Sequence, residues 1–163
     1  MTITTKMFPP ALEFAMQVTL RLRKPRLEVP NLPGGGDRLA VVIESGTFEG
    51  PQLRGDVIPG AGEWPHVRPD GVFSFDARYH LREADGTLIY LQNKGYRHAS
   101  PEVMERLFAL RPGDFVAPSE YYFRCTPSFE TAPGKHDWLT RHVFIGVGER
   151  MEEGNRITYW KVL

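Results

Sequence analysis

Apolar and polar residues alternate along most of the chain. In residues 11–23 the side chains of Phe14, Met16, Val18 and Leu20 fall on one side of a period-two pattern, and polar residues fall on the other. This period is that of a β-strand with one buried face. The same pattern predicts further strands at 38–45, 47–58, 71–83, 86–96, 119–127, 141–149 and 156–163.

Turn residues separate these strands. Asp85-Gly86 stands between two alternating runs, which predicts an antiparallel hairpin of 71–83 with 86–96. Residues 24–38 contain three prolines and the triplet Gly34–Gly36, so we expect a loop there. The triplet leads into a β-branched strand and not into a helix, which argues against a phosphate-binding loop.

Only residues 100–114 show a helical pattern. Ser100 is a suitable N-cap, Pro101 suits the first turn, and an apolar stripe follows, made of Val103, Met104, Leu107 and Phe108. About eight strands with one short helix near 101–110 predict an all-β antiparallel barrel or sandwich. The length of 163 residues fits a single domain over 1–163.

Residues 71–83 raise the question of which strand face is inside. Asp76 and Arg78 share one face, while Phe73, Phe75 and Tyr79 share the other. If the aromatic face forms the core, the two charges are solvated. If the sheet closes around a ligand, the same charges line a pocket. Periodicity leaves both interpretations open.

Charge and cysteine content narrow the class of protein. Lys plus Arg and Asp plus Glu number 20 each, so no net field favours nucleic acid or an anionic membrane. No apolar run is long enough to span a membrane, and the N-terminus lacks the pattern of a signal peptide. The single Cys125 suits a reducing compartment. We therefore expect a cytoplasmic protein, and the sequence leaves open whether it forms a homo-oligomer.

Polar residues embedded in aromatic strands are the candidates for chemistry. They are Glu63, Trp64, Asp76, Arg78, Tyr90, Arg97, Tyr122, Arg124, Glu130 and Trp138. They are either ion pairs of an outer face or the lining of a cavity that holds an anion and moves protons. The five histidines show neither HxH nor HExxH spacing, so no metal site is expected.

Three stretches resemble the family of domain of unknown function 3237. They are "GTFEGPQLRGDVIPGAGEW", "DGVFSFDARYHLREADGTLIY" and "YYFRCTPSFETAPGKHDWL". The resemblance spans nearly the whole chain and implies a compact, lipocalin-like β-barrel. Gly60-Ala61-Gly62-Glu63-Trp64 departs from the family's usual Gly-Gly-Ala-Asp-Trp, which adds a methylene to that carboxylate.

The resemblance also implies a site. The polar positions typical of the family pattern fall on Glu63, Trp64, Asp76, Arg78, Tyr90, Arg124, Glu130 and Trp138. On this analogy we expect Asp76 and Arg78 to face the barrel lumen. We also expect Glu63, Asp76, Arg78 and Arg124 to converge there, walled by Trp64, Tyr90 and Trp138.

Two functions follow from this site. The first is a cofactor-independent lyase, isomerase or hydratase for a small aromatic or carbonyl metabolite. Its catalytic candidates are Glu63, Asp76, Arg78, Arg124 and Glu130, and its ligand-binding candidates are Trp64, Tyr90, Arg97, Tyr122 and Trp138. The second is a carrier that binds a small ligand without chemistry. A structural or partner-binding role is a third interpretation, because fold alone does not fix function.

Overall fold

A computed structural model describes residues 8–163 of the chain. Residues 1–7, on which part of the expectation about the N-terminus depends, lie outside the described residues. The strands are β1 (Leu12–Leu22), β2 (Leu27–Val29), β3 (Asp37–Glu49), β4 (Arg54–Val57), β5 (Gly62–Glu63), β6 (His66–Val67), β7 (Phe73–Glu83), β8 (Leu88–His98), β9 (Tyr122–Thr131), β10 (Phe144–Arg150) and β11 (Gly154–Val162). The helices are α1 (Pro101–Phe108) and the 3₁₀ turns η1 (Pro118–Glu120) and η2 (Asp137–Arg141).

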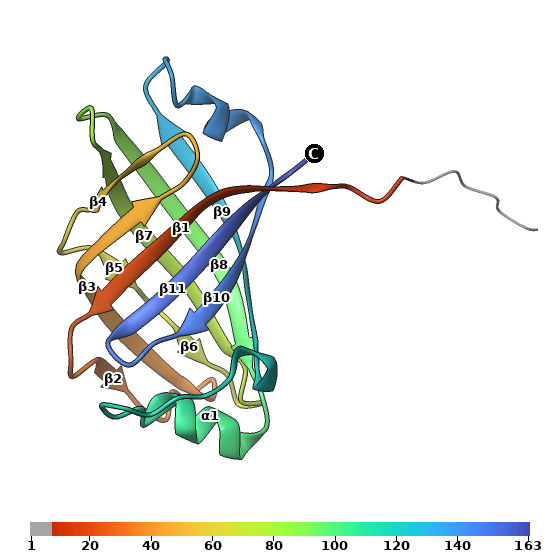
Figure 1. The fold of residues 1–163 in the computed structure, drawn as a ribbon. Helices are drawn as coiled ribbons and strands as arrows, with labels where there is room; N and C mark the ends of the chain where they lie inside the picture. Colours follow the sequence, from red (N-terminus) through yellow and green to blue (C-terminus); the bar gives the residue numbers. More distant parts are fainter. Residues whose placement is uncertain (1–7) are drawn as a thin grey trace, which may run out of the picture.

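The strands form a closed antiparallel barrel with eight positions around its wall. Pairing runs in the order β1-β11-β10-β9-β8-β7, and β3 pairs with β1 to close the ring. The short strands β4, β5 and β6 each lie between β3 and β7, so together they fill one position. Figure 1 shows the tilted strands surrounding one interior. The predicted all-β barrel with one short α-helix is therefore confirmed.

The strand bounds differ from the prediction where glycine or proline interrupts the pattern. Gly46 suggested a break, yet β3 continues through it and stays paired with Leu20 of β1. Pro51 lies in the turn that follows, so β4 is confined to Arg54–Val57. Strands β2, β5 and β6 were not predicted, because two or three residues are too few to show a period. Strand β2 lies within 24–38, so the expectation of a loop there is wrong for Leu27–Val29, which pair with β3.

The predicted hairpin at Asp85-Gly86 is confirmed. Strands β7 and β8 pair antiparallel from Phe73 with Arg97 to Arg82 with Leu88. Gly86 adopts φ of 90°, a left-handed conformation that glycine adopts without a steric penalty. The hairpin therefore turns where the sequence indicated.

The helix α1 closes one end of the barrel. The Ser100 side chain accepts a hydrogen bond from the Val103 backbone N–H at the N-terminus of the helix. Met104 and Leu107 are buried in the main core, and Val103 and Phe108 pack against it. The helix lies across the lower end of the barrel in Figure 1, so the predicted packing of its apolar stripe is confirmed.

Aromatic and aliphatic side chains fill the middle of the barrel. Tyr79 of β7 and Tyr159 of β11 are fully buried, and their hydroxyl oxygens are 3.4 Å apart. Asn93 donates from Nδ2 to the Tyr159 hydroxyl at 2.9 Å. Cys125 is buried beside this group, and burial raises the pKa of its thiol to about 12. These side chains belong to one continuous core in the middle of the barrel.

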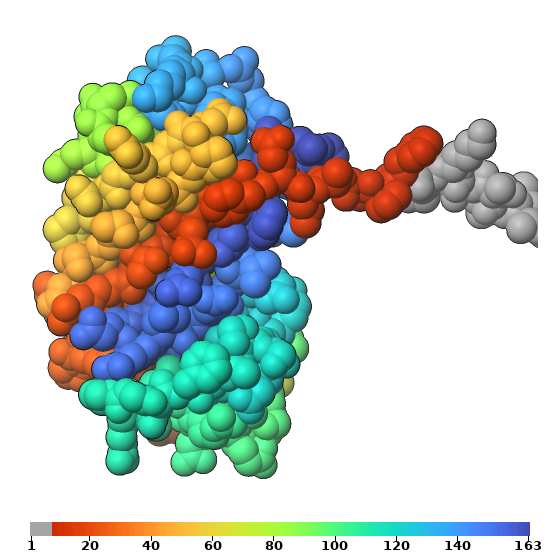
Figure 2. Space-filling view, viewed as in Figure 1, coloured from red at the N-terminus to blue at the C-terminus, as the bar shows by residue number. Residues whose placement is uncertain are grey.

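On the face drawn in Figure 2, β1, β11 and β10 form adjacent bands without a gap in the wall. The chain after α1, coloured teal, covers the lower end of these bands. Within residues 8–163, no helix is long and apolar enough to cross a membrane.

Candidate functional site

A cavity of about 510 Å³ lies at the end of the barrel that α1 covers. We call it the helix-end cavity. Its lining includes nine apolar residues, five basic residues and two acidic residues. The apolar ones are Leu22, Pro25, Leu39, Val41, Phe73, Leu107, Phe108, Ala109 and Leu110, and the others are Arg23, Lys24, Arg26, Arg97, Arg150, Glu28, Glu63 and Asn155. The volume suits a small organic molecule, and the excess of cations suits an anion.

Glu63 reaches this cavity because of its strand pairing. It stands opposite Val41 of β3 and Ala77 of β7, which both point into the barrel. Burial raises the pKa of the Glu63 carboxyl, and the charges of Arg97 and Arg150 partly oppose that rise. A carboxyl group with a raised pKa can both accept and donate a proton nearer neutral pH.

Arg97 is a buried cation at the same cavity. Only 5% of it is exposed, and its Cζ lies 4.2 Å from the ring centroid of Phe73 and 5.4 Å from that of Phe108. Burial, followed by repulsion from Arg150, lowers its pKa to about 10. Among residues 8–163 no carboxylate forms an ion pair with it, and its buried Nε has no hydrogen-bond partner. A buried charge without a counter-ion favours an anionic ligand.

Arg150 and Asn155 belong to the cavity but were not among the predicted residues. Arg150 ends β10 and donates from Nη1 to the Gly154 carbonyl oxygen and, at 3.4 Å, to Asn155 Oδ1. Burial lowers the pKa of the Arg150 guanidinium. A signal was present in the sequence, because Arg150 has the same strand parity as the buried Phe144.

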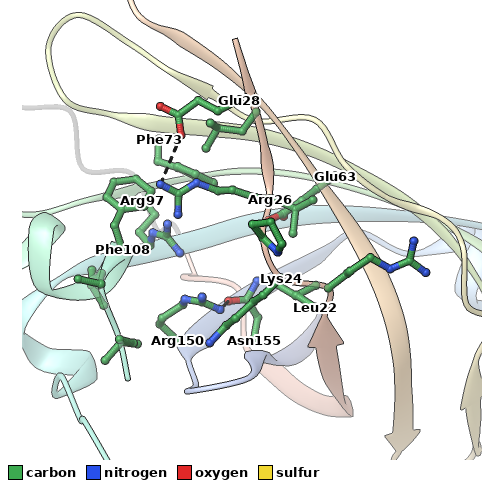
Figure 3. Close-up of a pocket in the computed structure, with 17 residues that line it drawn as sticks. Leu22, Lys24, Arg26, Glu28, Glu63, Phe73, Arg97, Phe108, Arg150 and Asn155 are labelled. Atoms are coloured by element: carbon green, nitrogen blue, oxygen red, sulfur yellow. Dashed lines mark hydrogen bonds and ion pairs between the residues drawn. The ribbon is translucent and has the colours of Figure 1, made fainter. Parts of the chain in front are cut away.

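The segment between β1 and β2 completes the cavity. Arg26 forms an ion pair with Glu28, with 3.6 Å between Nη2 and Oε2, and its Cζ lies 4.9 Å from the Phe108 ring centroid. Figure 3 shows Arg26, Arg97 and Arg150 approaching one space from different elements, with Glu63 on its far wall. Five basic residues therefore line the cavity together with two acidic ones, Glu28, which is paired with Arg26, and Glu63.

The expectation that Asp76 and Arg78 face the lumen is wrong. Both lie on the outer wall, where 32% of the Asp76 side chain and 53% of the Arg78 side chain are exposed. Arg78 Nη2 donates to Asp76 Oδ2 at 3.0 Å, and Gln92 Nε2 donates to Oδ1 at 3.0 Å. The aromatic face, with Phe73, points inward instead. Eight strands leave an interior just wide enough for side chains to fill, so apolar burial decides which face turns in.

Most of the other candidates also lie outside the helix-end cavity. Arg124, Tyr122, Glu130 and Tyr90 occupy the outward parity of β8 and β9. The expectation that Arg124 enters the lumen is therefore wrong, and its Cζ lies 5.4 Å from the outward Tyr122 ring.

The two candidate tryptophans also stand apart from the cavity. Trp64 is 50% exposed, beside Asp76 in a pocket of about 490 Å³ on the outer wall. Trp138 belongs to η2, which lies at the other end of the barrel (Figure 1), and it packs against Phe144 of β10. Of the ten predicted residues, only Glu63 and Arg97 line the helix-end cavity.

The outer-wall position of Arg78 leads to a prediction. We expect Arg78→Ala to leave the urea midpoint of unfolding and ligand binding unchanged, because an exposed pair is screened by water. Equilibrium unfolding followed by tryptophan fluorescence, with ligand titration of the same preparation, measures both quantities. A large loss of ligand affinity in Arg78→Ala would contradict this prediction and place Arg78 in the ligand-binding site.

The raised pKa of Glu63 predicts a pH dependence of stability. A carboxyl group that holds its proton more tightly in the folded state stabilises the fold fully below its ordinary pKa of 4.5. This contribution is lost as the pH rises through the folded pKa. Above pH 4.5 the free energy of unfolding of the wild type should therefore fall relative to that of Glu63→Gln, whose amide stays neutral. Urea unfolding of both proteins across pH 4 to 8 measures the difference, and parallel profiles would contradict the prediction.

Comparison with known proteins agrees with the fold and places the chain in a family. Residues 10–162 match the model of the family described as "Protein of unknown function (DUF3237)". A UPF0311 protein of Clostridium acetobutylicum is 38% identical over 127 residues, which cover 78% of each chain. A β-barrel-like protein from Acinetobacter baumannii has a TM-score of 0.82 at 34% identity, covering 97% of this chain and 99% of its own.

A structure described as an enzyme from Penicillium herquei shares the fold. Its TM-score is 0.72 at 21% identity, and the match covers 99% of this chain and 100% of that one. The conserved fold, the span of the family match and the identity to the clostridial relative lead to one conclusion. The chain belongs to the DUF3237 family of β-barrel proteins.

Proposed function

We propose that the protein binds a small organic anion in the helix-end cavity and transfers a proton on it, as a cofactor-independent lyase, isomerase or hydratase. The observation that carries the proposal is the position of Glu63. Its partly buried carboxyl group, with a raised pKa, shares one cavity with the guanidinium groups of Arg97 and Arg150.

The lining supports the substrate class. Arg97 lacks an ion-pair partner among the described residues, so a carboxylate or enolate of the ligand would supply the missing counter-charge. The apolar side chains, Leu39 and Val41 among them, suit a carbon skeleton on the same molecule. A small aromatic or carbonyl carboxylate combines both features.

The proposed chemistry assigns one role to each group. Glu63 takes a proton from a carbon next to a carbonyl group, or returns one to it. Arg97 and Arg150 stabilise the negative charge that develops on the carbonyl oxygen. These side chains are held by strands β5, β8 and β10, so little reorganisation is needed during the reaction.

A carrier without catalysis is the second candidate. The nine apolar residues of the lining favour it, because a carrier needs a mostly apolar pocket and no proton transfer. The Penicillium herquei structure bears only on the fold, as an instance of this architecture in a protein described as an enzyme.

Metabolite capture tests the proposal and separates the two candidates. The purified protein is incubated with a cell extract, and bound small molecules are identified by mass spectrometry. Each captured compound is then followed by NMR in D₂O with wild-type protein. We expect a carboxylate whose α-proton exchanges or whose skeleton changes. Capture of an anion that stays unchanged would establish a carrier, and capture of neutral compounds alone would contradict the anion site.

A further inference from the structure

A second cluster of chemical groups lies at the end of the barrel opposite α1. It consists of Glu83 at the end of β7, Asp85 in the β7–β8 turn and His136 in the loop before η2. Figure 1 shows this turn and this loop together at the upper end of the barrel. One ligand atom from each side chain lies within 4.8 Å of the other two. The cluster shares no residue with the helix-end cavity.

His136 is the unusual member of the cluster. It is only 2% exposed, and within the described part of the chain neither ring nitrogen has a hydrogen-bond partner. Leaving a buried polar group without a partner is costly, so such groups are rare in folded proteins. His136 Nε2 is directed at two carboxylate oxygens, 3.7 Å from Glu83 Oε2 and 3.6 Å from Asp85 Oδ2.

These distances suit a shared metal ion better than hydrogen bonds. Ligand atoms about 2.0 to 2.2 Å from a tetrahedral Zn²⁺ are separated from one another by about 3.3 to 3.6 Å. Most N–H···O hydrogen bonds span about 2.7 to 3.2 Å between nitrogen and oxygen, which is shorter than the 3.6 and 3.7 Å separations at His136. One imidazole nitrogen and two carboxylate oxygens also form a ligand set that divalent transition metals accept.

The position and the burial of the two carboxylates favour binding of a cation. Asp85 N–H donates to Glu83 Oε2 at 2.7 Å, and Thr87 N–H donates to Asp85 Oδ1 at 2.9 Å, which fixes the turn. Glu83 is only 6% exposed, so its charge is costly unless it is neutralised.

Lys135 now neutralises part of this charge. Its Nζ lies 3.1 Å from Asp85 Oδ2 and 3.7 Å from Glu83 Oε2, but 60% of its side chain is exposed. A flexible, exposed lysine can leave the site when a divalent ion enters. With Lys135 in the site, both His136 ring nitrogens still lack a hydrogen-bond partner. A bound metal ion would provide a partner for Nε2.

We propose that Glu83, Asp85 and His136 form a binding site for a divalent transition metal ion, which ties the β7–β8 turn to the loop after β9. Solvent would complete the coordination on the exposed side of Asp85. The proposal goes against the expectation from histidine spacing, because the three ligands are brought together only by the fold. It is independent of the proposed function.

Zn²⁺ titration of the untagged full chain, after treatment with chelator, tests this site. Calorimetry should show saturable binding of one ion per chain. At a free Zn²⁺ concentration of 100 times Kd, the Tm should rise by about 5 to 10 °C. Asp85→Asn and His136→Gln should each weaken binding by at least about 100-fold, since even outer partners of a metal site matter by 10- to 100-fold.

Two further variants sharpen the test. Lys135→Met should bind Zn²⁺ more tightly than the wild type, because the competing ammonium group is gone. His80→Gln is the matched control, since His80 is exposed on the outer wall and should leave binding unchanged. If His136→Gln fails to fold, Asp85→Asn still tests the site, because Asp85 is exposed and its substitution should not disturb the core. Absence of saturable binding in both wild type and Lys135→Met, or undiminished binding in Asp85→Asn, would overturn the proposal.

Discussion

Replacing Glu63 by glutamine should reduce turnover of the captured metabolite by about 10²- to 10⁴-fold while leaving its affinity nearly unchanged. Glutamine keeps the shape and the hydrogen-bonding capacity of the side chain but cannot exchange a proton. The two arginines that bind the anion in the proposal, Arg97 and Arg150, remain in place. Single-turnover NMR of the substrate, together with calorimetric binding to the variant, separates the two effects.

Glu130→Gln is the matched control for this variant. Glu130 is an exposed glutamate on the outward face of β9, so the same chemical change is made far from the cavity. Turnover should stay at the wild-type rate. If Glu63→Gln retains full turnover, Glu63 is not the proton-transfer group. If the wild type binds the metabolite but does not convert it, the protein is a carrier.

Replacing Arg97 by methionine should weaken ligand binding by about 10- to 100-fold and stabilise the ligand-free protein by about 1 to 3 kcal/mol. The loss of affinity follows from removal of a charge-assisted hydrogen bond to the anion. The gain in stability follows from removal of a buried cation that has no ion-pair partner among residues 8–163.

The sign of the stability change depends on two opposing effects. Three rings, those of Phe73, Phe108 and Phe123, lie within 5.7 Å of Arg97 Cζ, and cation–π attraction contributes about 0.5 to 2 kcal/mol for each favourable ring. Desolvation of a buried ion costs several kcal/mol. We expect desolvation to be the larger effect, because of the three rings only that of Phe73, at 4.2 Å, lies close to Arg97 Cζ.

Urea unfolding and ligand titration measure both consequences in one protein. Arg124→Met is the control, because Arg124 is exposed on the outer wall and the same substitution there should change neither quantity by much. A less stable Arg97→Met protein would show that the aromatic rings hold the cation for structural reasons. Unchanged affinity would remove Arg97 from the binding site.

The sequence determined most of the fold by itself. Period-two alternation located the long strands, Asp85-Gly86 located the hairpin turn, and Ser100 located the start of the helix. These signals are local, since a strand, a turn or a helix cap is specified by residues within a few positions of one another. The local pattern was compatible with either a barrel or a sandwich, and the resemblance to the family favoured the closed barrel.

The tertiary structure decided which face of each strand turned inward. Alternation placed Asp76 and Arg78 on one face and Phe73 on the other, but only closure of the barrel assigned the second face to the interior. That choice minimises the apolar area left in water, and it depends on all eight positions of the wall. Family analogy had favoured the charged face, and it was wrong.

Both candidate sites also required the complete fold. Glu63 lies in a strand of two residues, and its direction is set by pairing with β3 and β7. The proposed metal site joins Asp85 to His136, far along the chain, through the pairing of β8 with β9. Contacts between residues so distant in sequence follow from strand order and register, and a local pattern carries no information on either.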